Sequence, residues 1–175
     1  QGGSAVGGSE RGQVDTGIGK SAPQGGTISL IAPTDLIAKA EETREIAGLQ
    51  VVFQLTPGTE APSEMNLYLP QMQALCIAEN AVKSLHNLLT PRGAEVRDGK
   101  AWAQFLDDAL VRYGDKAQVM FAQHNWPTWG GERIRTFLAD QRDMYAFLND
   151  RTLHLLNQGL TPLEIADSIK KLPGS

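Results

Sequence analysis

Residues 49–79 read LQVVFQLTPGTEAPSEMNLYLPQMQALCIAE, which is three short apolar runs separated by Pro, Gly and polar residues. The runs LQVVFQL, MNLYL and QALCIA each predict a strand, because they are short and bounded by turn formers. Residues 43–46 predict a hairpin with the first run through a turn at Ala47–Gly48. Two further runs, TISLIA (27–32) and AQVMFA (117–122), also predict strands. Inner strands of a sheet with covered faces have this apolar character.

Helical patterns dominate the chain after residue 99. Apolar residues recur at three- and four-residue steps in 100–113 and again in 132–157, which predicts amphipathic helices. The longer pattern is compatible with one helix or with two helices separated near 149–150. TPLE at 161–164 is a capping-box sequence with Pro at the first helical position, and it predicts a third, short helix. The residues therefore indicate an α/β fold that ends in helices.

Composition excludes several classes of protein. The 175 residues carry a formal net charge of −4, whereas a protein that binds nucleic acid electrostatically usually presents a basic face. No apolar run approaches the roughly 20 residues needed to span a bilayer. A single cysteine, Cys76, excludes an internal disulfide framework and a cysteine-based zinc finger. We expect a globular domain without a membrane span.

Three of the apolar runs lead into residues that can bind a metal ion. The run 49–55 leads through TPGT to Glu60, QALCIA leads directly to Glu79, and AQVMFAQ leads directly to His124. In layered α/β folds, sites form beyond strand ends, where loops converge. Zinc accepts imidazole nitrogen and carboxylate oxygen, and a carboxylate can bridge two metal ions. The pattern therefore indicates a candidate metal site.

Each of these residues also has a purely structural interpretation. Glu60 after Pro-Gly-Thr fits a solvated loop residue, and His124 fits a packed, hydrogen-bonded histidine. Glu79 fits the N-terminal cap of a helix beginning at Asn80. From the residues alone, both interpretations stay open.

The stretch HNLLTPRGAEVR contains a candidate anion site formed by Asn87, Arg92 and Arg97. Guanidinium groups present paired donors that match two oxygens of a sulfate or phosphate. In the alternative interpretation, the arginines lie on the surface and pair with Glu95 or Asp98.

At these residues the chain resembles the alkylsulfatases of the metallo-β-lactamase superfamily, which hydrolyse detergents such as dodecyl sulfate. The resemblance runs from about residue 11 to the C-terminus. The matching stretches are IAPTDLIAKAEETREI, FQLTPGTEAPSEMNLYLP, ALCIAEN, LHNLLTPRGAEVRD, FAQHNWPTWG and QRDMYAFLNDRTLHLLNQGLTPLEIADSI.

The resemblance implies a division of the chain. Residues 1–26, with half of the 18 glycines, correspond to a loop within the catalytic domain. Residues 27–135 correspond to the C-terminal half of that domain, which is part of an αββα sandwich. Residues 136–175 correspond to the start of an α-helical dimerisation domain. The expected partners are therefore the N-terminal part of the catalytic domain and a second copy in a homodimer.

The resemblance also implies roles for individual residues. Glu60 matches a zinc ligand, Glu79 matches the carboxylate that bridges two zinc ions, and His124 matches a ligand of the second zinc. Asn87 and Arg92 match sulfate-binding positions, and Arg97 matches a further sulfate contact.

Other residues are assigned less directly. We expect His86 to be structural or to lie beside the ligands rather than to bind metal, because the family motif places the ligand at His124. Trp126 and Trp129 either line a channel for the alkyl tail or pack in the core. The implied reaction is zinc-dependent hydrolysis of an alkyl sulfate ester to an alcohol and inorganic sulfate.

One departure from the family limits this expectation. The family's zinc site also needs a His-x-His-x-Asp-His cluster, whereas this chain has three histidines, His86, His124 and His154, and no such cluster. We therefore expect the chain by itself to be inactive and to be part of a larger enzyme.

Alternatives to this function remain open. One is a non-catalytic or dimerising structural piece, and another is a hydrolase of the same fold acting on another anionic ester, a lactam or a thioester. Because the family is often exported in bacteria, we expect a periplasmic or secreted protein, with a cytoplasmic location left open.

Overall fold

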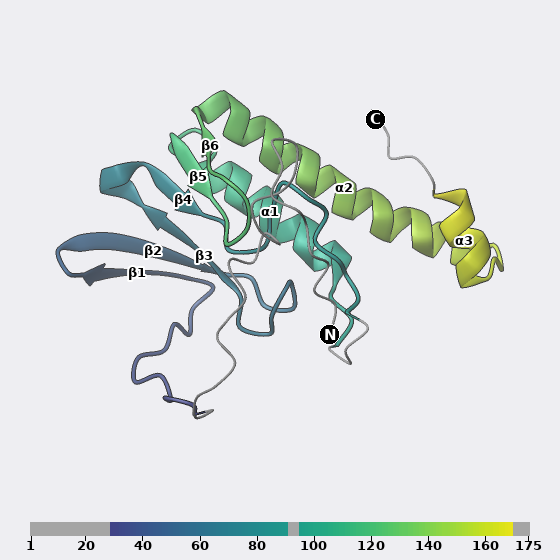
Figure 1. Ribbon diagram of the computed structural model, residues 1–175, viewed down its shortest axis with the longest axis horizontal. Helices are drawn as coiled ribbons and strands as arrows, with labels where there is room; N and C mark the ends of the chain where they lie inside the picture. Colours follow the sequence, from purple (N-terminus) through teal and green to yellow (C-terminus); the bar gives the residue numbers. More distant parts are fainter. Residues whose placement is uncertain (1–28, 91–94, 170–175) are drawn as a thin grey trace, which may run out of the picture. The chain divides into compact units, whose positions relative to one another are not determined.

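The computed structural model describes residues 29–90 and 95–169, and Figure 1 shows how its helices and strands are arranged. The chain divides into two compact units, residues 1–36 and 37–175, and the described helices and strands all lie in the second. The described part of the first unit, residues 29–36, has neither helix nor strand. The predicted Gly-rich loop, residues 1–26, lies outside the described residues.

The strand predicted at 27–32 is wrong in the part that the structure describes, residues 29–32. Leu30 and Ile31 are 90% and 91% exposed, and among the described strands none pairs with them. A strand is stable only where a neighbouring strand satisfies its backbone hydrogen-bonding groups. An apolar, β-rich composition does not supply that neighbour.

Within the described residues, six strands form one sheet in which sequence order and spatial order agree, β1-β2-β3-β4-β5-β6. Neighbouring strands are antiparallel except β4 and β5, which are parallel. The remaining predicted strands are thereby confirmed. The bounds of the six strands are β1 Glu41–Ile46, β2 Leu49–Leu55, β3 Met65–Leu69, β4 Ala74–Cys76, β5 Val119–Phe121 and β6 Thr128–Trp129.

The predicted hairpin between β1 and β2 is confirmed, with a turn at Ala47 and Gly48. Both turn residues are left-handed, with φ of 52° and 80°. Two left-handed central residues define the turn type whose twist matches that of the flanking strands. Gly48 adopts this conformation without the steric cost that Ala47 carries. A short 3-10 turn, η1 (Pro70–Met72), connects β3 to β4.

Three helices complete the described fold. They are α1 (Gly99–Tyr113), α2 (Gly131–Asn157) and α3 (Pro162–Ser168). Asp98 caps α1 by accepting hydrogen bonds from the backbone of Lys100 and Ala101, and Thr161 and Glu164 form the predicted capping box of α3. The break considered near 149–150 does not occur, because α2 is continuous. It also continues through residues 135 and 136, where the sequence places a domain boundary that stays a prediction.

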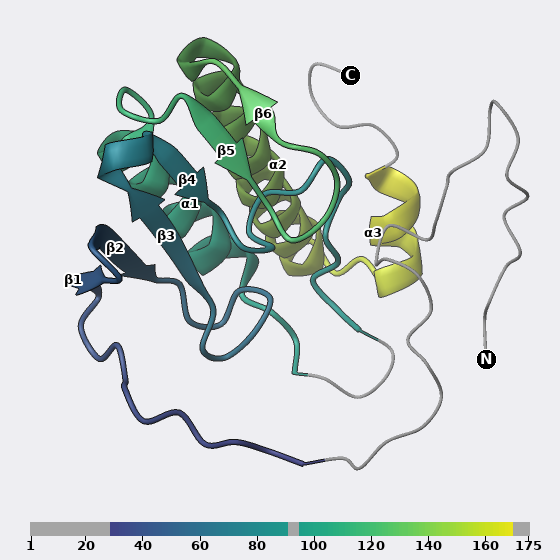
Figure 2. The ribbon, with the colours of Figure 1, turned by 60° about the vertical axis from the view of Figure 1, so that its left-hand side comes forward.

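One face of the sheet packs on α1 and α2, which lie behind the strands in Figure 2. Along β3, β4 and β5 the side chains of Tyr68, Leu75 and Met120 point into this layer, where Trp102 and Tyr145 are fully buried. The helix connecting β4 to β5 makes their parallel pairing possible, since parallel neighbours need a long crossover. This core fixes the strand ends from which the candidate site residues emerge.

The opposite face of the sheet is also apolar. Side chains alternate along a strand, so the neighbours of the core residues point to this second face. The strand register aligns Phe53, Leu67, Cys76 and Phe121 in one row across β2, β3, β4 and β5. Phe121 is 38% exposed, and Leu67 and Cys76 are half-buried. A sheet that is apolar on both faces is typical of the middle of a layered fold.

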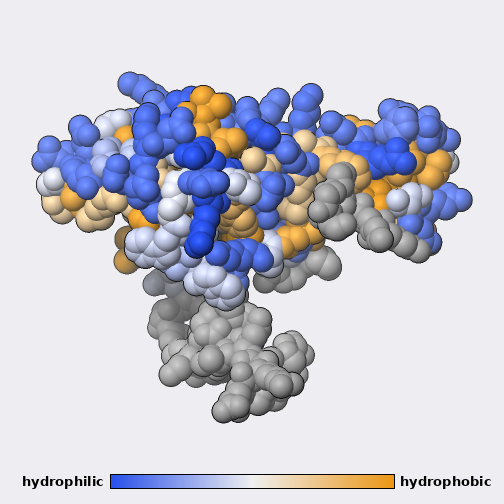
Figure 3. Space-filling model, turned by 90° about the horizontal axis from the view of Figure 1, so that it is seen from above, coloured by the Kyte–Doolittle hydropathy of each residue, from blue (hydrophilic) through white to orange (hydrophobic). Residues whose placement is uncertain are grey.

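Apolar side chains are also exposed toward the C-terminal end of the described helices. Leu153 and Leu156 on α2 are 49% and 52% exposed, and Leu163 on α3 is 81% exposed. Figure 3 shows apolar patches among charged side chains at the end of the molecule that carries α3. Among the described helices, none has the length and apolar character needed to cross a membrane.

We expect the 175-residue chain to associate with itself when it is produced alone, because the row on the second sheet face stays accessible. Light scattering at increasing concentration measures this association. Phe121→Lys should reduce it, whereas Val111→Lys, at a position on α1 that is 78% exposed, should not. A monomer with a sharp, cooperative thermal transition would contradict the expectation.

Candidate metal centre

Parallel pairing of β4 and β5 brings Glu79 and His124 together. Backbone pairing continues past the strand ends, where the amide of Gln123 donates to the carbonyl of Ala78 over 3.0 Å. The residues that follow, Glu79 and His124, therefore leave the same edge of the sheet. His124 Nε2 lies 3.2 Å from Glu79 Oε1. The helix-cap interpretation of Glu79 is wrong, because residues 78–80 form a turn and the next described helix begins at Gly99.

The loop after β2 carries Glu60 to the same place. It closes through a hydrogen bond from the Thr56 amide to the Glu64 carbonyl (2.9 Å), and the Thr59 hydroxyl donates to the Thr56 carbonyl (2.7 Å). Gly58 has a φ of +78°, a left-handed conformation that favours glycine. The loop is thus held from within.

A fully buried asparagine, Asn80, links this loop to the one that carries Glu79. Its side-chain amide donates to Thr56 Oγ1 over 3.0 Å and to Asn66 Oδ1 over 2.8 Å. Its backbone carbonyl accepts from the indole of Trp102 over 2.8 Å. Buried polar groups that are hydrogen-bonded in this way fix backbone position, because breaking one bond leaves an unsatisfied group. Asn80 therefore holds Glu79 relative to the loop of Glu60.

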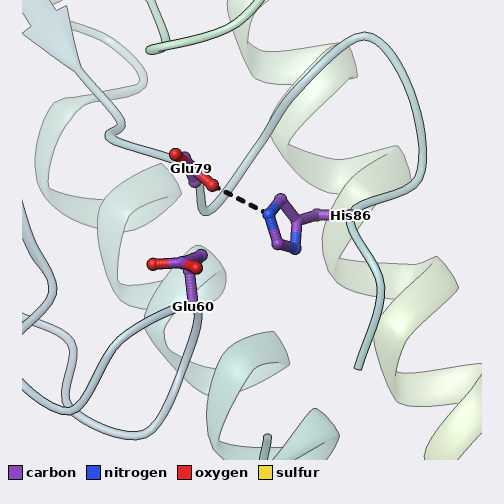
Figure 4. A group of neighbouring side chains, drawn as sticks. All are labelled: Glu60, Glu79 and His86. Atoms are coloured by element: carbon purple, nitrogen blue, oxygen red, sulfur yellow. Dashed lines mark hydrogen bonds and ion pairs between the residues drawn. The ribbon is translucent and has the colours of Figure 1, made fainter. Parts of the chain in front are cut away.

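Figure 4 shows the group that results, in which Glu60 from the loop after β2 approaches Glu79 and His86 from the segment between β4 and α1. One ligand atom from each residue lies within 4.8 Å of the other two, and all three residues are half-buried. His86 Nε2 lies 2.8 Å from Glu79 Oε2, while His124 approaches the other carboxylate oxygen of Glu79. Glu79 is therefore central, with one imidazole at each of its oxygens.

A further carboxylate in this group, Glu64, was not predicted from the sequence. Burial raises the pKa of Glu64 to about 7, and the negative charges of Glu60 and Glu79 and a hydrogen bond with Glu60 add to the rise. Only closure of the 56–64 loop places Glu64 there, since the EAPSE sequence resembles an ordinary acidic loop. His86 was expected to be structural or to lie beside the ligands, and the structure places it against Glu79.

The candidate anion residues are held in different ways. Arg97 is largely buried and donates to Glu60 Oε1 (2.7 Å), to the Glu60 carbonyl (2.9 Å) and to Asn87 Oδ1 (2.6 Å). The surface interpretation, in which Arg97 pairs with Glu95 or Asp98, is thus wrong. Arg92 lies outside the described residues. The roles of Asn87, Arg92 and Arg97 as sulfate contacts stay predictions.

The chemistry of this donor set fits a divalent cation. Three carboxylates and two imidazoles converge, and the raised pKa of Glu64 reflects both its burial and the repulsion among the carboxylates. A cation would relieve that repulsion, and zinc accepts this mixture of nitrogen and oxygen ligands. Glu79 lies close to both Glu60 and His124, whereas the three residues whose ligand atoms all approach one another are Glu60, Glu79 and His86. The roles of Glu60, Glu79 and His124 as zinc ligands stay predictions.

Comparison with known proteins shows the class to which this fold belongs. Protein-family profiles give no match. A metallo-beta-lactamase family protein from Thermus thermophilus superimposes with a TM-score of 0.51 at 21% identity, over 71% of this chain and 39% of that one. The fold is that of the metallo-β-lactamases, which confirms the expected fold class.

Closer relatives specify the family within that fold. An (R)-specific secondary-alkylsulfatase of Pseudomonas sp. is 57% identical over 93% of this chain and 24% of its own length. The alkyl/aryl-sulfatase BDS1 of Saccharomyces cerevisiae is 52% identical over 95% of this chain and 26% of its own. The solved structure of the inverting sec-alkylsulfatase Pisa1 from Pseudomonas sp. superimposes with a TM-score of 0.82 at 59% identity, over 83% of this chain and 23% of that one.

The chain is therefore similar to alkylsulfatases over nearly its whole length and has the metallo-β-lactamase fold, and it spans about a quarter of the length of these relatives. This confirms the resemblance found in the sequence.

Glu64 should make the metal-free protein less stable at higher pH. Its carboxyl is protonated more readily in the fold than in the unfolded chain, so its stabilising contribution is complete below about pH 4.5 and is lost as the pH rises through about 7. Allowing for its partial exposure, the loss is about 1–2 kcal/mol.

Urea unfolding at pH 5 and pH 8 checks this expectation. Glu64→Gln should lack that part of the pH dependence, whereas Glu45→Gln, at an exposed position on β1, should retain it. Equal pH dependence in the two variants would contradict the assignment.

Proposed function

We propose that this chain forms part of the active site of an alkylsulfatase that hydrolyses alkyl sulfate esters to an alcohol and inorganic sulfate. The observation that carries the proposal is the position of Glu79, with His86 and His124 at its two oxygens and Glu60 beside it. The names of the relatives support the substrate class, since those proteins are called alkylsulfatases.

In this proposal Glu60, Glu79 and His124 would hold two zinc ions together with ligands from a part of the protein outside these 175 residues. When bound, the two zinc ions supply Lewis acidity toward the ester and lower the pKa of water in the site. Glu79 would suit a bridging role, because its carboxylate has two oxygens and lies close to both Glu60 and His124. The His-x-His-x-Asp-His cluster expected of the family is the source we propose for the missing ligands.

The sulfate head would lie against Asn87, Arg92 and Arg97. Asn87 is exposed, and its side-chain oxygen faces Arg97, which leaves the amide donors directed elsewhere. Guanidinium and amide donors stabilise negative charge as it grows on the departing sulfate, so their effect is larger in the transition state than in the bound substrate. Their donors thus favour an anionic ester head over a neutral substrate.

Two exposed tryptophans offer an apolar surface for the alkyl tail. Trp126 is 70% exposed and Trp129 is 66% exposed, so the core-packing role considered for them is wrong in this structure. Trp126 follows His124 by two residues, and its ring lies 5.4 Å from the Lys83 ammonium. The alkyl tail of a substrate whose sulfate group is bound near His124 would extend toward this surface.

The remaining expectations extend the same proposal. The exposed Leu153, Leu156 and Leu163 on α2 and α3 support a homodimer formed through the helical end of the chain. The N-terminal part of the catalytic domain would cover the second face of the sheet. Export to the periplasm or outside the cell stays a proposal.

Glu79→Gln in the full-length protein should abolish most hydrolysis of dodecyl sulfate, because an amide is neutral and cannot bridge two cations as a carboxylate does. We expect kcat to fall at least about 100-fold and the zinc content to fall from about two per protomer. Sulfate release and elemental analysis measure both. Glu95→Gln, at an exposed position, serves as control, and a Glu79→Gln protein with full zinc and full activity would refute the proposal.

Arg92→Ala should raise KM for alkyl sulfates about 10-fold or more, because a paired, charged donor to the sulfate is lost. Arg92→Lys should recover the charge without the paired geometry and give an intermediate KM. Steady-state kinetics with alkyl sulfates of two chain lengths check this. A KM that Arg92→Ala leaves unchanged would exclude the sulfate-binding role.

A further inference from the structure

A buried tyrosine on α2 contacts the loop that carries His86. Tyr145 is fully buried and stacks on Trp102, with ring centroids 4.6 Å apart. Its hydroxyl donates to the backbone carbonyl of His86 over 3.0 Å. Tyr145 lies in the middle of α2, and its stacking on Trp102 ties it to α1 as well. The loop of His86 is thus fixed to the helical layer.

The imidazole of His86 continues the contact toward Glu79. Its Nε2 lies 2.8 Å from Glu79 Oε2, and its Nδ1 lies 3.2 Å from the carbonyl of Asn87. Because a carboxylate oxygen accepts, Nε2 is the donor in the shorter contact. The ring also packs on Trp102, with centroids 5.6 Å apart. Both ring nitrogens therefore face oxygen acceptors of the protein itself.

We infer that Tyr145 and His86 form a positioning chain that runs from α2 to Glu79 and sets the orientation of its carboxylate. Tyr145 holds the backbone of His86, and His86 holds Glu79 Oε2, so that Oε1 is directed toward His124. His86 is thus a positioning residue and not a ligand. This inference rests on the proposed function, since the carboxylate that Tyr145 and His86 position is the one that would bridge the two metal ions.

These contacts matter because a glutamate side chain can adopt many orientations. Glu79 has a flexible side chain and follows Ala78, which is left-handed with a φ of 48°. Hydrogen bonds from outside the ligand set restrict a ligating carboxylate to one orientation, and their loss typically lowers metal affinity about 10- to 100-fold. Carboxylate repulsion from Glu60 and Glu64 acts against that orientation.

The test uses the full-length protein in four variants, His86→Ala, His86→Gln, Tyr145→Phe and Tyr113→Phe. Tyr113→Phe is the matched control, because Tyr113 is also a buried helical tyrosine and its hydroxyl has no hydrogen-bond partner among the described residues. Zinc affinity is measured by competition with a chelator. Hydrogen exchange of residues 81–90 is measured in the metal-free protein.

We expect His86→Ala to lower zinc affinity about 10- to 100-fold. His86→Gln should recover most of it, because its side-chain amide can donate to Glu79 while replacing an imidazole ligand poorly. Tyr145→Phe should lower affinity a few-fold and speed exchange in 81–90, and Tyr113→Phe should change neither.

Two results would overturn the inference. If His86→Gln binds zinc as weakly as His86→Ala, His86 is itself a ligand. If Tyr145→Phe and Tyr113→Phe behave alike in both measurements, Tyr145 does not position the loop. The proposed function can fail separately. It fails if the variants show the expected ranking of zinc affinities but the wild-type protein releases no sulfate from alkyl sulfates. A wild-type protein that binds no zinc would overturn both.

Discussion

The rest of this structure depends on the parallel pairing of β4 with β5. That pairing directs Glu79 and His124 from the same edge of the sheet, and it is possible because α1 crosses between the two strands. Were the pairing antiparallel, the two side chains would leave opposite edges. The fully buried Trp102 joins the crossover helix to this arrangement, since its indole binds the carbonyl of Asn80, the residue after Glu79. The fold and the site are therefore fixed by the same contacts.

Clustered carboxylates oppose folding in the absence of a cation, and the structure contains groups that offset this repulsion. Arg97 binds Glu60 at both its carboxylate and its backbone carbonyl, and it contacts Asn87 on the neighbouring loop. A guanidinium presents several donors in a fixed plane, so a single residue can join two loops. The imidazoles of His86 and His124 also offset this repulsion, because both contact the carboxylate of Glu79. The site is thus held together by contacts within the protein, and the raised pKa of Glu64 reflects first its burial and then the repulsion from Glu60 and Glu79.

The two faces of the sheet differ in how deeply their side chains are buried. The face toward α1 and α2 carries a packed core. In the apolar row on the other face, Phe53 is buried, whereas Leu67 and Cys76 are half-buried and Phe121 is 38% exposed. The chain spans about a quarter of its relatives, and the metallo-β-lactamase fold is layered. In a layered fold, a central sheet is apolar on both faces because another layer packs against each face.

The sequence by itself determined most of the element types, the hairpin, the resemblance to alkylsulfatases, and the acidic and histidine residues that follow the strands, because periodicity, turn residues and capping are local properties. It did not determine that Glu64 joins Glu60, that Arg97 pairs with Glu60, or that His86 contacts Glu79. Those contacts join residues up to 37 positions apart, and they arise only when loops close and strands pair. The sequence also predicted a strand at 27–32, whose described part lacks a neighbour. Which strands and loops pair with one another depends on the tertiary structure, and the local composition of a segment does not predict it.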